Sequence, residues 1–137
     1  MSERDTGRPG DEIGGTKEER SAAAPLVIAA VVGAVSWFTA SAMSGRREAW
    51  DASLYWMLVY PAAIAVSALL GHQYPARAWR WPVALFAGQF VAMLVRNGEL
   101  GGLWPLGLLL FGVLALPALL AAYVAARIGR RSAGGAP

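Results

Sequence analysis

Four long apolar stretches constrain the fold of this 137-residue chain more than any other feature. They cover about residues 25–43, 52–71, 79–97 and 103–127, and their few charged residues lie near their ends. An α-helix rises about 1.5 Å per residue, so each stretch can cross a hydrocarbon core about 30 Å thick, the third only marginally. None shows the alternation that is typical of a membrane strand. With short connecting loops, the sequence predicts an all-α membrane protein, a four-transmembrane-helix antiparallel bundle.

The composition excludes most classes of soluble protein. Hydrophobic residues make up 56% of the chain and charged residues 15%, and ten of the 21 charged residues precede Ser21. A soluble domain carries about 25% charged residues. The basic residues are scattered at the ends of the apolar stretches and are not gathered on one face. We therefore expect a lipid bilayer as the surroundings of this protein, and no nucleic acid partner.

Residues 1–21 form a separate region that is rich in glycine and charge. Four basic and six acidic residues give this region a net charge of −2. It cannot bury enough apolar surface to offset the ordering of its chain, which predicts a disordered cytoplasmic tail. A short helical turn is compatible with residues 16–20, because Thr16 and Glu19 have the spacing of a capping box. The transmembrane domain is then expected over residues 22–131, with a disordered C-terminus at 132–137.

The distribution of lysine and arginine predicts the orientation of the chain in the membrane. Four spans place nine of these residues on the side of the N-terminus and three on the other side. Because basic residues in short loops stay in the cytoplasm, both termini are expected to be cytoplasmic. The composition, rich in Ala, Gly and Arg, favours the inner (plasma) membrane of a bacterium.

The first apolar stretch has a second interpretation, as a secretory signal. Ala40, Ser41 and Ala42 would suit a cleavage site, which would make Met43 the first residue of the mature chain. The acidic leading segment and the length of the apolar stretch argue against cleavage, so we favour four spans.

Catalytic chemistry finds little support in the sequence. The chain has no cysteine, and His72 is its single histidine. A thiol nucleophile, a cysteine-bound metal and a multi-histidine metal site are therefore excluded within one chain. We expect no catalytic residues, no metal site, no cofactor and no enzymatic activity.

Small residues recur at helical spacing in each apolar stretch, which predicts close helix–helix contacts. In lipid, association depends on close backbone approach rather than on burial of apolar surface. The four stripes contain Ala29, Gly33, Ser36 and Ala40; Ala63, Ser67 and Gly71; Ala84, Gly88 and Ala92; and Ala118, Ala122 and Ala126.

Three polar side chains are expected at one level of the membrane. Counted from the same end of each helix, Ser36, Tyr60 and Gln89 lie roughly 10–12 Å deep, and Gly112 lies at a similar depth. We predict a polar layer of these three side chains, with Gly112 admitting a partner or a small cavity. The layer is either an interhelical hydrogen-bond clip or a ligand or permeation site, and the clip is the simpler interpretation.

Two charged residues are expected just outside this layer. Arg96 follows Gln89 by seven residues, which places both on one side of the helix, and Glu99 is a local acidic partner. With their neighbours they form either an interfacial salt-bridge network or a binding vestibule. At the other end, prolines and aromatic residues separate arginines in residues 71–82, which favours anchoring at lipid headgroups. The alternatives for this loop are a protein-docking patch and a specific lipid site.

These features together predict a non-enzymatic accessory or assembly subunit of a membrane complex. Its partner would be a second copy of the chain, another membrane protein, or both. The first alternative is a passive channel or small-solute transporter that uses the polar layer. The second alternative is an enzyme that acts on lipid headgroups, for which the sequence offers no recognisable nucleophile and base.

Overall fold

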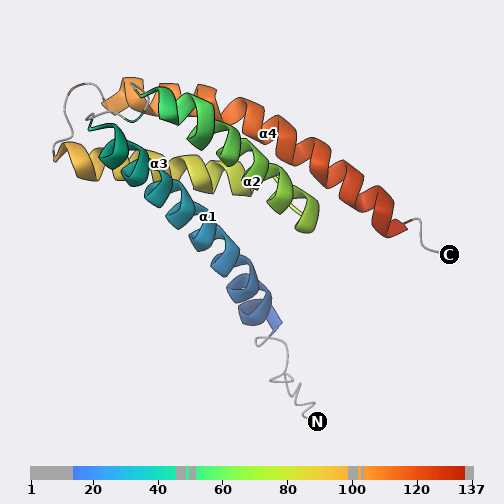
Figure 1. The fold of residues 1–137 in the computed structure, drawn as a ribbon. Helices are drawn as coiled ribbons and strands as arrows, with labels where there is room; N and C mark the ends of the chain where they lie inside the picture. The colour runs from blue at the N-terminus through green and yellow to red at the C-terminus, as the bar shows by residue number, and fades with distance from the viewer. Residues whose placement is uncertain (1–13, 46–48, 50–51, 99–101, 103, 135–137) are drawn as a thin grey trace, which may run out of the picture.

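A computed structural model describes residues 14–45, 49, 52–98, 102 and 104–134, with side chains from residue 23 onward. The described chain is helical and contains no strand. Four α-helices and one short π-helix follow one another along the sequence (Figure 1): α1 (Gly14–Ser44), η2 (Tyr55–Val59), α2 (Tyr60–Gln73), α3 (Arg80–Asn97) and α4 (Trp104–Gly134). The predicted all-helical class is therefore confirmed.

The helix bounds agree with the sequence prediction except at the two ends of the chain. Helix α1 begins at Gly14, inside the segment that we expected to be a tail, and α4 continues to Gly134. Residues 17–24 are mostly Lys, Glu, Arg and Ala, which are good helix formers and extend the apolar helix toward the N-terminus. The rest of both predicted tails, residues 1–13 and 135–137, lies outside the described residues.

Successive helices run in opposite directions, so the chain has two distinct ends. The start of α1, the turn at residues 74–79 and the end of α4 lie at one end, which we call the terminal end (Figure 1). Helix α1 diverges from α2 and α4 toward this end, and the four helices come together at the opposite end (Figure 1).

Helix α3 is the central element, because it packs against α1, α2 and α4. Its contact with α1 depends on two glycines. A Cβ atom added to Gly33 would collide with the backbone carbonyl of Leu85, and one added to Gly88 would collide with that of Ala30. Helices α2 and α4 approach in the same way, since Gly71 lies against the backbone of Ala122. Small residues thus bring both helix pairs into backbone contact.

The interior consists of small and aromatic residues, and the surface consists of large aliphatic ones. The predicted small-residue stripes are buried, apart from the half-buried Ser36 and Ala84. Large side chains such as Met57 (80% exposed) and Leu109 (65% exposed) point outward from the helices. A soluble protein of this size rarely exposes so continuous an apolar surface.

Three helical segments are long and apolar enough to cross a membrane. They are Ala23–Ser44, Tyr55–Gln73 and Trp104–Gly134. Helix α3 is not among them, because its 18 residues include Arg80, Gln89 and Arg96, which make it less apolar than these three segments.

Pro61 changes the helix around it into a local π-helix. A proline has no N–H to donate to the carbonyl four residues back, and its ring crowds that carbonyl. The turn before Pro61 is widened, and the N–H of Tyr60 donates to the carbonyl of Tyr55, five residues earlier. A proline inside a helix disturbs the turn before it, and at Pro61 this disturbance takes the form of η2.

Candidate functional site

A buried hydrogen-bonded cluster joins α1, η2 and α3. The Tyr55 hydroxyl donates to Oε1 of Gln89 (2.9 Å), and Nε2 of Gln89 donates to the Ser36 hydroxyl (3.4 Å). The Ser36 hydroxyl donates in turn to the backbone carbonyl of Gly33 (2.7 Å). We call Ser36, Tyr55 and Gln89 the Gln89 cluster.

The contact between the glycines explains why this cluster forms. Gln89 follows Gly88 directly, and Ser36 follows Gly33 by three residues, which is nearly one turn of α1. Because the two backbones touch at these glycines, the short side chain of Ser36 reaches the amide of Gln89. The amide is completely buried, and both its oxygen and its nitrogen have a partner.

Tyr55 is the member that the sequence analysis did not include, because it lies near the start of the second apolar stretch and not at the predicted depth of Ser36 and Gln89. In an α-helix, residues five positions apart lie about 140° apart around the axis. The wider turn of η2 brings Tyr55 and Tyr60 closer to one face, and their rings stack with centroids 6.3 Å apart. Tyr55 is fully buried and meets Trp37 edge to face at 5.9 Å. The signal for its position was Pro61, six residues later.

Tyr60 has a different partner from the one we expected. Its hydroxyl donates to the backbone carbonyl of Leu114 in α4 (3.1 Å) and not to Gln89. Leu114 lies in the turn before Pro117, which removes the N–H that the neighbouring Val113 carbonyl would otherwise accept. The tyrosine thus joins the start of α2 to α4 next to the carbonyl that Pro117 leaves without a donor, and it does not replace that lost bond.

Of the other residues that we expected at or near this level, the structure describes Arg96 and Gly112. Arg96 is exposed in the last turn of α3, and Glu99 lies outside the described residues. Gly112 lies on the exposed face of α4, with no atom within 4 Å of an added Cβ, so it lines no cavity within the described chain. Depth along a helix does not determine which face a residue occupies.

A groove between α1 and α2 borders the Gln89 cluster, with Leu85 of α3 as part of its lining. Its volume is about 220 Å³, and it is open to the surroundings. Apart from the hydroxyls of Ser36 and Thr39, its side chains are apolar and mostly small or β-branched. They are Val32, Leu58, Val59, Ala62, Ala63, Val66 and Leu85.

The terminal end carries a second group of polar contacts, formed by the turn after α2 and the last turns of α4. Nη2 of Arg127 donates to the Tyr123 hydroxyl (2.7 Å), and its guanidinium lies 4.9 Å from the centre of that ring. Nη1 of Arg130 donates to the carbonyl of Pro75 (3.0 Å), which ties the turn to α4.

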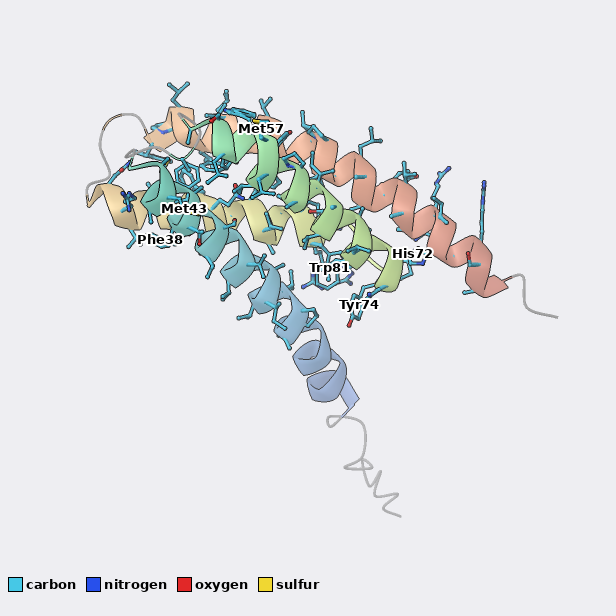
Figure 2. All side chains as sticks on the ribbon, viewed as in Figure 1. Phe38, Met43, Met57, His72, Tyr74 and Trp81 are labelled. Atoms are coloured by element: carbon cyan, nitrogen blue, oxygen red, sulfur yellow. The ribbon has the colours of Figure 1, made fainter. Side chains whose placement is uncertain are left out.

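Aromatic residues lie beside these arginines. Nε1 of Trp81 donates to the carbonyl of Tyr74 (3.2 Å), and the two rings meet at 5.4 Å. Figure 2 shows these residues and His72 at the terminal end, with Phe38, Met43 and Met57 toward the opposite end.

The chemistry available to these groups is limited. The Gln89 cluster contains an amide and two hydroxyls, which are hydrogen-bonded to one another and to the Gly33 carbonyl. The described residues include no group of three or more His, Cys, Asp or Glu that could hold a metal ion. Comparison with protein-family models, with curated proteins and with solved structures finds no match to this chain.

Proposed function

We propose that this chain is a multi-pass membrane protein that acts as a non-enzymatic accessory or assembly subunit, either in a complex with another membrane protein or as a homo-oligomer. The nature of its surface supports a membrane location. Large aliphatic side chains are exposed along α1, α2 and α4, and small and aromatic residues fill most of the interior. This is the arrangement expected where lipid is the solvent and small residues mediate helix contacts.

In this proposal α3 is the fourth membrane span. Its weaker apolar character has a physical explanation, because it packs against all three other α-helices. Eight of its residues are buried, including Gln89, so few of its side chains would have to face lipid. A central helix tolerates polar residues that a peripheral helix would not.

The proposed orientation has both termini in the cytoplasm of a bacterium, with the domain in the inner membrane. Two observations support it. Both ends of the described chain lie at the terminal end (Figure 1), and five of the six arginines with described side chains are at that end. An excess of arginine is typical of cytoplasmic loops.

The observation that carries the functional proposal is the backbone contact within two helix pairs, α1 with α3 and α2 with α4, which leaves no open space inside either pair. A permeation pathway needs open space between helices, but Gly33 and Gly88 bring the backbones of α1 and α3 into contact. The buried amide of Gln89 is already bonded within the protein. We therefore interpret the Gln89 cluster as a clip that holds α1, η2 and α3 together.

The groove between α1 and α2 supports lateral assembly. Ser36, Ala62 and Ala63 in its lining are small, which allows the backbone of a neighbouring transmembrane helix to approach closely. The groove opens on the side of the molecule, where a membrane partner would meet it.

Two measurements test this function. Native mass spectrometry of protein extracted in mild detergent is expected to detect assemblies heavier than the 14.5 kDa monomer, containing further copies or a second membrane protein. Liposomes containing the protein are expected to show no more flux of ions or small solutes than empty liposomes. A monomer alone, or a flux that Gln89→Leu abolishes, would refute the proposal.

A further inference from the structure

The terminal end concentrates positive charge without acidic residues from the same segments. Residues 52–98 and 100–137 contain no aspartate or glutamate. Five arginines of these segments lie at the terminal end, in the turn before α3, at its start and in the last turns of α4. We call them the arginine cluster: Arg77, Arg80, Arg127, Arg130 and Arg131.

Two of these arginines occupy positions that oppose folding stability. Arg77 has a φ of 57°, a left-handed conformation that residues other than glycine, asparagine and aspartate rarely adopt. Arg80 begins α3, where the helix dipole favours an anion and disfavours a cation. Within the described part of the chain, neither guanidinium has a hydrogen-bond partner. No contact within the described chain therefore accounts for a positive charge at Arg77 or at Arg80.

The other arginines are held in place by the protein. Arg127 is bonded to Tyr123 and lies over its ring, and Arg130 is bonded to the Pro75 carbonyl. Each of these contacts uses one or two of the five N–H donors of a guanidinium, so donors remain for a bound anion. A phosphate group is well matched to such a fork of donors.

We propose that the arginine cluster binds the headgroups of anionic phospholipids, an inference that rests on the membrane location proposed above. Exposed aromatic rings at the same end favour a lipid over other polyanions. Trp79 is 58% exposed and Tyr123 is 49% exposed, next to the apolar surfaces of the helices. Tryptophan and tyrosine rings are enriched where hydrocarbon meets headgroups. A nucleic acid would also neutralise the arginines, but it would give no reason for exposed Trp79 and Tyr123 rings next to the apolar helix surfaces.

The test is a lipid titration of the full chain in mild detergent, followed by native mass spectrometry. Dioleoyl phosphatidylglycerol is expected to bind more tightly than dioleoyl phosphatidylcholine. Arg77→Gly removes a charge and suits the left-handed backbone, so it is expected to weaken phosphatidylglycerol binding about fivefold without lowering thermal stability. Arg80→Gln is a second variant with the same expectation, because it relieves the start of α3 of a cation.

Arg96→Gln is the matched control, since it removes one exposed arginine from the opposite end of α3. It is expected to change phosphatidylglycerol affinity less than twofold. An equal effect of Arg96→Gln and Arg77→Gly, or equal binding of the two lipids, would overturn the inference. So would displacement of the lipid by a short oligothymidylate, which would indicate a nucleic acid site.

Two further outcomes distinguish a failure of the lipid site from a failure of the proposed membrane location. Residues 1–13 carry Glu3, Asp5, Asp11 and Glu12, and their acidic side chains are a competing occupant from the chain itself. Selective lipid binding only after deletion of residues 1–13 would assign the arginine cluster to that segment. Protein that is soluble without detergent would refute the membrane proposal, whereas reconstituted protein with no lipid preference would refute only the lipid site.

Discussion

The hydroxyl of Tyr55 lies 2.9 Å from Oε1 of Gln89, and both side chains are fully buried. This bond connects the start of the second helical segment to the middle of α3 across 34 positions of sequence. It fixes one end of the Gln89 cluster, while Ser36 fixes the other.

Removing the hydroxyl is expected to destabilise the protein. Tyr55→Phe leaves the Gln89 oxygen buried without its donor, and we expect a loss of about 1–2 kcal/mol in the free energy of unfolding. Unfolding in mixed detergent micelles, followed by circular dichroism, measures this loss. Tyr74→Phe is the control, because Tyr74 is exposed at the terminal end, and a change as large as that of Tyr55→Phe would contradict the clip.

Adding one methyl group at the crossing of α1 and α3 is expected to separate the two helices. In Gly88→Ala, the new Cβ atom collides with the backbone of Ala30, which cannot move aside as a side chain would. We expect a loss of about 1–3 kcal/mol, read from the same unfolding assay.

Gly112→Ala provides the matched comparison for that substitution. No atom lies within 4 Å of its added Cβ, so the variant should keep or gain stability through the better helix propensity of alanine. If both alanine variants behaved alike, the close approach of the two backbones would be refuted.

Replacing Pro61 is expected to uncouple Tyr55 from Gln89. Pro61→Ala restores the N–H that the proline lacks, which allows the widened turn of η2 to return to α-helical geometry and rotates Tyr55 away. Tyr55→Phe should then cost less in the Pro61→Ala background than in the wild type. A double-mutant cycle measures this coupling, and additive effects of the two substitutions would count against the role of the π-helix.

The absence of cysteine allows a direct test of the proposed orientation. Single cysteines are placed at Ser132, near the end of α4, and at Gly102, at the opposite end. A membrane-impermeant maleimide applied to spheroplasts is expected to label Gly102→Cys at once and Ser132→Cys only after the membrane is permeabilised. The reverse pattern would place the termini outside the cell, and labelling of both before permeabilisation would contradict the two-sided arrangement.

Much of the helical framework could be predicted because it depends on local spacing. Small residues three and four positions apart must share one helix face, and those of α2 and α4 are buried as a result. Counting residues from a common end also placed Ser36 and Gln89 at one level, where they are hydrogen-bonded.

The remaining details depend on where each helix departs from ideal geometry. The π-helix before Pro61 turns Tyr55 inward, so a count based on regular helices selected Tyr60 in its place. The outward direction of Gly112 could not be predicted, because the direction of a residue around the axis depends on how α4 packs. The direction in which a side chain faces around its helix axis depends on contacts between helices, which cannot be read from the sequence of one helix.

The central position of α3 has a consequence for biosynthesis. If the chain is inserted into a bilayer as proposed, a helix containing Arg80, Gln89 and Arg96 gains little by entering lipid alone. Its most extensive packing partner is α1, which emerges from the ribosome before it. Partitioning of α3 from the translocon should therefore follow the earlier helices, and α4 would complete the enclosure last.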